Sequence, residues 1–399
     1  MNIAILSVSK KGKELSSRLK LLLDEDPTII KVSTFHKNVK DNLDIIFNNK
    51  NYDAIIGIMA TGILIRSIAD KIQDKTRDPA IVSIDDNGNH VVSLVSGHLG
   101  GANELTKKIA KLIGSEAVIS TATDNNNKIG IDTLATKLQW EIINKNQILF
   151  FNKAILEEKP IKLYINLGNR DKIEYIDYIK DYLKNQENNT LEIIDIKNTK
   201  LSKDKIIKDI FTSDISNKTK NKVQQDYKDK NYQDYKDKNY QDYNDEDYQL
   251  YNDYNIIATF DNHKMFFKPR KIVLGIGARA NISKDKILTS IKTAMNNLNL
   301  AIERIDYIAT AEIKKDEKGI LDAVTEINKN LEIVTINEIK NFKSEDISSS
   351  DFVKENFDIP GVAEPTALIV AKKISNDDSK LIHKKIAVDG VTVAVAVSK

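Results

Sequence analysis

A histidine framed by three glycines is the part of this sequence best suited to chemistry. Gly97, Gly100 and Gly101 surround His98, and glycines allow positive φ angles and a close approach of the backbone to a ligand. Apolar residues recur at three- and four-residue spacing directly after them, which predicts an amphipathic helix that begins near Ala102. The free N–H groups at a helix start attract anions, and an imidazole exchanges protons near neutral pH. We therefore expect this segment to bind an anionic group and to take part in proton transfer.

Polar residues at other predicted strand ends are the partners that we expect for His98. They are Thr61, Gly62, Arg66, Asp85, Thr121, Thr123 and Asp124, and Ser96 and Asn103 flank the glycine segment itself. Ligands of open parallel sheets bind outside the carboxyl ends of the strands, so these ends are predicted to converge on one cleft. Simpler interpretations stay open, because Asp85 can stabilise a turn, Arg66 can lie on the surface, and a histidine can be structural.

The two ends of the chain have the pattern of α/β domains. The first 140 residues alternate strands, expected at 3–8, 53–59, 80–85, 91–95 and 117–120, with amphipathic helices. This alternation is typical of a mostly parallel sheet flanked by helices. The pattern returns from residue 269 to 399, where Asp389-Gly390 predicts a closing hairpin. The fold class is therefore α/β, with an N-terminal domain over 1–140 and a C-terminal domain over 269–399.

A small α/β middle domain is expected between them, over residues 141–268. It contains a low-complexity insert at about 214–254, in which the octapeptide DYKDKNYQ is repeated and aliphatic residues are almost absent. Such a composition cannot bury a core, so the insert is predicted to be disordered.

Composition argues against several classes of function. The 60 Lys and Arg nearly balance the 58 Asp and Glu, so the net charge of +2 gives no general attraction to nucleic acid or to an anionic membrane. Cys is absent, and no two of the five histidines have the spacing of metal ligands, so a protein metal site is not expected. No apolar stretch reaches the about 20 residues of a membrane span and no signal peptide is recognisable, which predicts a cytoplasmic protein.

One motif suggests a different function. Gly275, Gly277 and Ala280 follow a predicted strand and match the Gly-x-Gly-x-x-Ala fingerprint of dinucleotide-binding folds. That fingerprint needs an acidic residue after the second strand, whereas Glu303 precedes the second strand here. An NAD(P)-dependent oxidoreductase is therefore the weaker alternative.

Taken together, the chain resembles the cobalt-precorrin-5A hydrolase family (CbiG) of anaerobic cobalamin biosynthesis over almost its entire length. In the N-terminal domain the resemblance rests on Gly62 with Arg66, on residues 96–103 and on residues 121–124. In the C-terminal domain it rests on Gly275-Ile276-Gly277, Val362-Ala363-Glu364 and Val391-Thr392-Val393-Ala394. The chain departs from the family at Ala278, where a Cys is common, and in its tyrosine-rich insert.

The resemblance implies a hydrolase that opens the δ-lactone of cobalt-precorrin-5A with water and releases acetaldehyde to give cobalt-precorrin-5B. Cobalt arrives within the substrate, so no further cofactor is expected. Arg66, the helix starts and the threonine hydroxyls would bind the carboxylates of the corrinoid, and Glu364 would shape the other side of the cleft. Transient contact with the neighbouring methyltransferases of the pathway is a further expectation.

The catalytic roles stay open at this point. Either His98 or Asp124 is expected to activate the water, while amides of the glycine segment stabilise the oxyanion. A carrier that binds corrinoid intermediates without turning them over would use the same carboxylate-binding residues. Release of acetaldehyde distinguishes the hydrolase from such a carrier.

Overall fold

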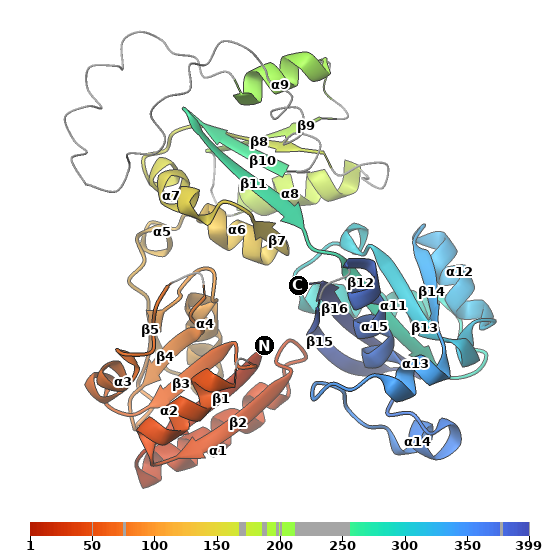
Figure 1. Ribbon diagram of the computed structural model, residues 1–399, viewed down its shortest axis with the longest axis horizontal. Coiled ribbons are helices and arrows are strands. Elements are labelled where there is room, and N and C mark those ends of the chain that lie inside the picture. Colours follow the sequence, from red (N-terminus) through yellow and green to blue (C-terminus); the bar gives the residue numbers. More distant parts are fainter. Residues whose placement is uncertain are drawn as a thin grey trace.

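Three sheets, each flanked by helices, are arranged around a common centre (Figure 1). The computed structural model describes residues 1–49, 51–74, 77–166, 173–185, 190–196, 199, 202–211, 256–375 and 378–398. The insert predicted to be disordered, at about 214–254, lies outside these residues. The described residues confirm the predicted α/β fold class.

The N-terminal sheet has the strand order β2-β1-β3-β4-β5-β6. Its strands are β1 (Asn2–Ser7), β2 (Lys31–His36), β3 (Ala54–Ile58), β4 (Ala80–Ile84), β5 (His90–Val95) and β6 (Glu116–Val118). Its helices are α1 (Lys10–Asp24), α2 (Val39–Asn48), α3 (Thr61–Ile68) and α4 (Ala102–Ile113). Side chains of a strand alternate between its two faces, so Ile3 and Ile5 pack with α1 and α4, whereas Ala4 and Leu6 pack with α2 and α3.

The direction of β5 decides where the candidate residues lie. Strands β1 to β4 are parallel, but β5 runs antiparallel to β4 and β6 runs parallel to β5. The reversal is a tight turn in which the Asp85 carboxylate accepts hydrogen bonds from the backbone N–H groups of Asn87, at 2.9 Å, and His90, at 2.7 Å. Strands β5 and β6 therefore end at the edge of the sheet where β1, β3 and β4 begin.

The middle unit is a mixed sheet with the order β7-β11-β10-β8-β9. Its strands are β7 (Trp140–Ile142), β8 (Ile161–Ile165), β9 (Leu191–Asp195), β10 (Ile256–Phe260) and β11 (His263–Pro269). The helices of this region are α5 (Ala122–Asn125), α6 (Ile131–Lys137), α7 (Ile148–Leu156), α8 (Ile173–Asn185) and α9 (Lys203–Phe211). Ile131 and Leu134 of α6 belong to the core of this unit, although the predicted boundary falls after residue 140.

The C-terminal sheet has the order β14-β13-β12-β16-β15. Its strands are β12 (Ile272–Ala278), β13 (Tyr307–Ala311), β14 (Asn330–Val334), β15 (Ser379–Val388) and β16 (Val391–Ser398). Its helices are α11 (Lys284–Asn297), α12 (Lys318–Glu326), α13 (Ile336–Asn341), α14 (Asp351–Phe357) and α15 (Ala363–Ser375). Asp389 and Gly390, at φ 50° and 87°, form the turn of the predicted β15–β16 hairpin.

Three strands are absent from the sequence-based prediction for a common physical reason. Strand β2 exposes much of its surface and is an edge strand, β7 has only three residues, and β11 carries His, Lys and Pro among its aromatic residues. Each therefore lacks a long apolar or alternating pattern. Among the described residues, no helix is long and apolar enough to span a membrane.

Candidate active site

The glycine segment forms a tight loop at the end of β5. Ser96 and Gly101 have positive φ angles of 56° and 84°, and the Ser96 hydroxyl donates to the Asp78 carbonyl at 2.9 Å. A Cβ atom at Gly100 would lie 2.5 Å from the Cβ of Ser96, and one at Gly97 would lie 2.7 Å from the side-chain oxygen of Asn103. The glycines are therefore needed for close packing, and the loop leads directly into α4.

His98 lies between two carboxylates. Its Nδ1 is 3.2 Å from Asp132 Oδ2 and its Nε2 is 3.1 Å from Asp124 Oδ2, while the Thr123 hydroxyl is 2.9 Å from Nε2. The side chains of all three charged residues are largely shielded from solvent, with exposed fractions of 14% for His98, 17% for Asp124 and 7% for Asp132. An imidazole can donate to both carboxylates at once only when both of its nitrogens are protonated.

Asp124 is held by several further donors. Its Oδ2 accepts from Asn103 Nδ2 at 2.9 Å and from the Thr121 hydroxyl at 2.8 Å, and its Oδ1 pairs with Lys107 Nζ at 2.8 Å. Thr121 is the N-cap of α5 and Asp124 lies in that helix, whereas α4 supplies Asn103 and Lys107. The structure thus brings together the predicted residues of the glycine segment and of the segment 121–124.

The charges of this cluster stabilise one another. Burial alone would lower the pKa of the His98 imidazole, but the hydrogen bonds and negative charges of Asp124 and Asp132 raise it to about 9. Burial would likewise raise the pKa of the Asp124 carboxyl, but hydrogen bonds from His98, Lys107 and Thr121 hold it well below its usual range. At neutral pH, His98 is therefore an imidazolium and an acid rather than a base.

Asp132 is the member of the cluster that sequence reasoning missed. It lies in α6 of the middle unit, where Asn152 Nδ2 of α7 donates to its Oδ1 at 3.0 Å. The only signal in the sequence is an acidic residue beside apolar positions, which does not identify a partner 34 residues away. The His98–Asp132 pair also links the N-terminal domain to the middle unit.

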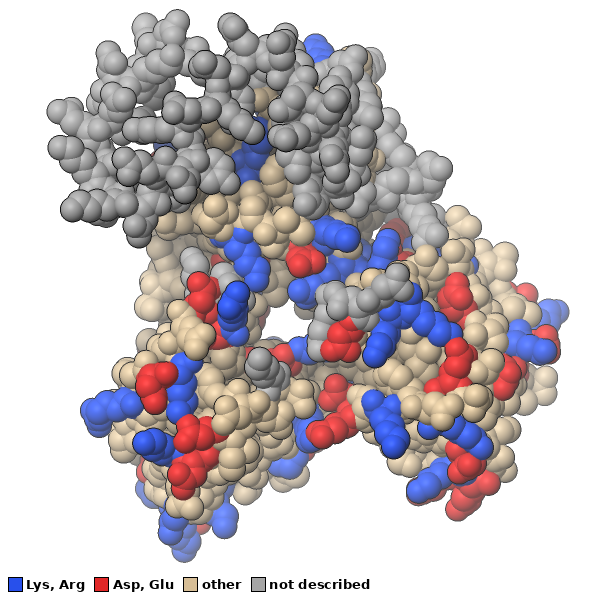
Figure 2. Space-filling model, in the orientation of Figure 1, with Lys and Arg blue, Asp and Glu red and all other residues tan. Residues whose placement is uncertain are grey.

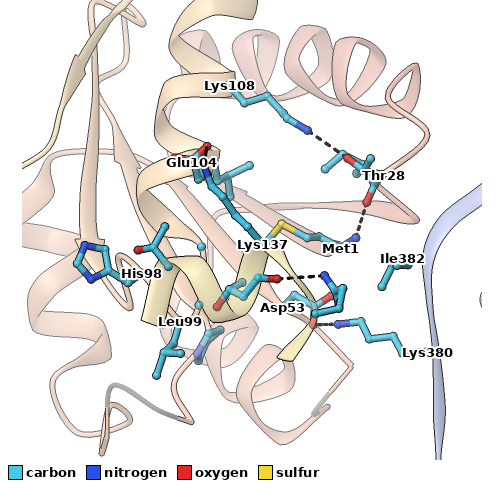
Figure 3. Close-up of a pocket in the computed structure, with 18 of the residues that line it drawn as sticks. Met1, Thr28, Asp53, His98, Leu99, Glu104, Lys108, Lys137, Lys380 and Ile382 are labelled. Atoms are coloured by element: carbon cyan, nitrogen blue, oxygen red, sulfur yellow. Dashed lines mark hydrogen bonds and ion pairs between the residues drawn. The ribbon is translucent and has the colours of Figure 1, made fainter. Parts of the chain in front are cut away.

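His98 lines a cavity of about 2180 Å³ between the three sheets. Residues 98–101 and α4 form one side, Thr133, Thr136 and Lys137 of α6 come from the middle unit, and β15 and residues 296–300 come from the C-terminal domain. Figure 3 shows His98 and Leu99 on one side of this space and Lys380, on a strand of the C-terminal domain, on the other. Asp124 and Asp132 are not among the described residues that line the cavity, and they contact His98 from behind it.

The described lining of the cavity has an excess of positive charge. Its basic residues are Lys71, Arg77, Lys107, Lys108, Lys111, Lys137, Arg270 and Lys380, and its acidic residues are Asp44, Asp53, Asp78 and Glu104. Figure 2 shows Lys and Arg side chains around the opening between the three parts of the molecule. Because the chain as a whole carries only +2, this local excess favours an anionic ligand here.

Four predicted ligand-binding residues lie at the opposite edge of the N-terminal sheet, so the predicted single cleft is wrong. Thr61, Gly62 and Arg66 follow β3 and Asp85 follows β4, whereas His98 follows the antiparallel β5. A five-residue strand separates the two edges by about 15 Å, at roughly 3.3 Å per residue. The Thr61 hydroxyl lies 3.0 Å from that of Ser83, Arg66 is exposed on α3, and Asp85 stabilises the β4–β5 turn.

The predicted residues of the C-terminal domain have structural roles. Glu364 is 2% exposed, its Oε2 accepts from the backbone N–H of Ser348 at 2.7 Å, and its Oε1 accepts from that of Lys385 at 2.9 Å. A Cβ atom at Gly275 would lie 1.9 Å from the Ala363 carbonyl oxygen, so this glycine permits the close approach of α15. Packing thus accounts for the first glycine of the dinucleotide-like motif.

Among the described residues, no group of three or more His, Asp or Glu is arranged to hold a metal ion.

The fold and the site together define a class of protein, namely a three-part α/β protein with a cationic cavity and a proton donor in its wall. Comparisons with known proteins identify the family. Residues 46–124 match the family described as "Cobalamin synthesis G N-terminal" and residues 272–396 match "Cobalamin synthesis G C-terminus". The chain belongs to the cobalamin synthesis G family, because a full-length relative is also similar.

That relative, from Methanocaldococcus jannaschii, is named "Probable cobalt-precorrin-5A hydrolase" and is 30% identical over 99% of each chain. A cobalt-precorrin-5A hydrolase of Priestia megaterium is 23% identical over 98% of this chain and 94% of its own. The crystal structure of a cobalamin biosynthesis protein G homologue from Sulfolobus solfataricus has the same fold, with a TM-score of 0.52, 24% identity, and coverage of 100% of this chain and 97% of that chain.

Proposed function

We propose that this protein is a cobalt-precorrin-5A hydrolase, which opens the substrate's δ-lactone with water and releases acetaldehyde to form cobalt-precorrin-5B. The observation that carries the proposal is the similarity, over 99% of both chains, to a relative with that name. The cavity supports it, because a tetrapyrrole-derived ring carries several carboxylates and the described lining has eight basic against four acidic residues. Cobalt enters as part of the substrate in this proposal.

His98 is proposed as the proton donor and acceptor of the reaction. Water adds to the lactone carbonyl, the bond from the carbonyl carbon to the ring oxygen breaks, and both protons of the water pass to solvent as the new carboxylate forms. In this mechanism the His98 ring turns so that Nε2 leaves Asp124 and Thr123 and faces the cavity. The imidazolium then donates its Nε2 proton to the departing oxygen, which becomes a hydroxyl. Neutral His98 then takes that proton back as the adjacent carbon–carbon bond breaks. Acetaldehyde leaves, and the conjugated macrocycle accepts the electron pair.

Asp124 and Asp132 set the protonation state and orientation of His98 in this mechanism. Asp124 is a weak base, because four donor groups surround its carboxylate. It therefore acts as a partner of His98 that receives the Nε2–H between turnovers. The backbone N–H groups of residues 101–103 donate to the carbonyls of residues 96–98, so they stabilise the glycine loop and this mechanism gives them no oxyanion role. A cytoplasmic location and transient contact with pathway methyltransferases stay predictions.

Anaerobic incubation of the purified protein with cobalt-precorrin-5A tests the proposal. We expect stoichiometric acetaldehyde, trapped as a hydrazone, and conversion of the corrinoid to a product with an opened lactone. The alternative function, a carrier of corrinoid intermediates, predicts binding without acetaldehyde. Binding without acetaldehyde over many hours would therefore exclude the hydrolase.

A further inference from the structure

Helix α8 of the middle unit carries a ladder of three tyrosines. Tyr175, Tyr178 and Tyr182 are spaced three and four residues apart and so share one face of the helix. Their rings are nearly parallel, with centroid separations of 6.2 Å between Tyr175 and Tyr178 and 6.5 Å between Tyr178 and Tyr182. Tyr175 is buried in the core, whereas Tyr178 and Tyr182 are only partly buried.

The two partly buried rings belong to the wall of the cavity. Tyr178 and Tyr182 line it together with Leu99, the residue after His98, and all three pack against the core of the middle unit. The Tyr178 hydroxyl donates to the carbonyl of Asn299, which lies in the C-terminal part of the same wall. The tyrosines are therefore held on a helix within the wall that contains His98.

Two residues of the cavity wall have buried polar atoms without hydrogen-bond partners among the described residues. The Tyr182 hydroxyl and Arg270 Nε are buried and have no hydrogen-bond partner among the described residues. Both residues line the cavity. A buried donor without a partner is energetically unfavourable, and a ligand that accepts its hydrogen bond removes this cost.

Positive charge adjoins the aromatic surface. Lys137 Nζ lies 5.9 Å from the centroid of the Tyr182 ring, and Lys137 also lies 3.7 Å from Glu104 of α4. Lys107 of α4 lines the same cavity. The arrangement is thus an aromatic patch bordered by cations, which complements a conjugated ring with carboxylates around its rim.

We propose that Tyr178 and Tyr182 form the surface that binds the conjugated ring of the substrate, with Lys107, Lys137 and Arg270 binding the carboxylates at its rim. This inference rests on the proposed function for the identity of the ligand. It assigns a binding role to the middle unit, which lies outside the matched ranges 46–124 and 272–396. Burial raises the pKa of Tyr182 to about 12, so its hydroxyl stays a hydrogen-bond donor throughout the working pH range.

Equilibrium binding of cobyrinic acid, a cobalt corrin with free carboxylates, tests this surface without requiring turnover. Binding is measured on the full-length protein by the visible absorption of the corrin. The variant with both Tyr178→Leu and Tyr182→Leu should raise the Kd at least tenfold. Tyr182→Phe keeps the ring and should raise the Kd less than Tyr182→Leu does. Phe150→Leu is the matched control, because Phe150 is an aromatic residue of the same unit that stacks on His263 outside the described cavity lining.

The outcomes separate this inference from the proposed function. An unchanged Kd for the double leucine variant, or no binding of the corrin to the wild-type protein, would overturn the tyrosine surface even if acetaldehyde is released. Weakened binding in that variant together with no acetaldehyde from the wild type would support the surface and overturn the hydrolase. Thermal melting and the fluorescence of Trp140, in the core of the same unit, verify that each variant is folded.

Discussion

The two edges of the N-terminal sheet carry similar residues and differ in what surrounds them. At one edge, a glycine-containing helix start follows β3 and provides Thr61, Gly62 and Arg66. At the other, a glycine loop follows β5 and leads into α4. Among the described residues, the second edge and not the first lines the cavity between the three parts of the molecule. Side chains from different parts meet there, as in the His98–Asp132 and Asp53–Lys380 pairs.

The difference shows that strand direction, rather than residue type, places the site. Both edges have glycines and hydroxyls beside the start of a helix, so residue types alone do not distinguish them. The antiparallel course of β5 carries His98 away from Arg66 and toward the start of β1. A second carboxylate from α6 then completes the charge arrangement around the imidazole.

Loss of His98 should produce the largest effect and is the most direct test of this difference. His98→Gln keeps hydrogen-bonding capacity but removes the proton that the mechanism transfers, so kcat should fall by about 10²–10⁴. His90→Gln is the matched control, because His90 is an exposed histidine at the other end of β5. Its kcat should stay within about twofold of wild type. Steady-state acetaldehyde release measures both variants, and equal rates for them would remove His98 from the mechanism.

Much of the fold could be predicted from the sequence because local patterns suffice for it. The strand at 80–85 corresponds to β4, and Asp389-Gly390 marks the hairpin turn, since both depend on neighbouring residues alone. The glycine segment was also identified locally. By contrast, the direction of β5 depends on the β4–β5 turn, which makes β5 antiparallel to β4. A mostly parallel sheet, as the alternating pattern predicts, would place the end of β5 beside the ends of β3 and β4.

The rest of the site depends on contacts between parts of the chain. Asp132 meets His98 only after the middle unit docks on the N-terminal domain, so no spacing rule links them. Glu364 was predicted to face a ligand, yet its carboxylate accepts backbone N–H groups from distant segments. A single sequence identifies such residues as unusual but does not indicate whether a ligand or the backbone is their partner.

Asp132→Asn should have the next largest effect and tests whether the middle unit controls His98. Removing this negative charge lowers the pKa of His98 from about 9 toward its ordinary 6.5. The imidazolium form, and with it the activity, is present below the pKa and is lost as pH rises through it. The alkaline limb of kcat against pH should therefore move to lower pH, with a loss of about tenfold near pH 8. A lower melting temperature with an unmoved limb would indicate a purely structural role.

Glu364→Gln should lower stability and leave catalysis intact. This result would show that Glu364 has a structural role in the C-terminal domain and does not bind the substrate. The amide replaces one carboxylate oxygen with a donor that faces backbone N–H groups, which should cost about 1–3 kcal/mol of unfolding free energy. Glu355→Gln, at an exposed position of α14, is the matched control and should be nearly neutral. Chemical denaturation measures both. A normal stability with a large rise in KM would restore Glu364 to the binding site.

Arg66→Gln should have the smallest effect. It tests directly whether the edge that carries Arg66 takes no part in substrate binding. Arg66 is exposed on α3, on the side of the sheet away from the end of β5, so kcat and KM should stay within about twofold of wild type. Lys107→Gln is its counterpart at the cavity edge, where the loss of one cation beside Asp124 should raise KM several-fold. The KM values of the two variants for cobalt-precorrin-5A decide the comparison. If Arg66→Gln raised KM as much as Lys107→Gln, the carboxylates of the substrate would contact both edges, and the cavity as described would be only part of the binding site.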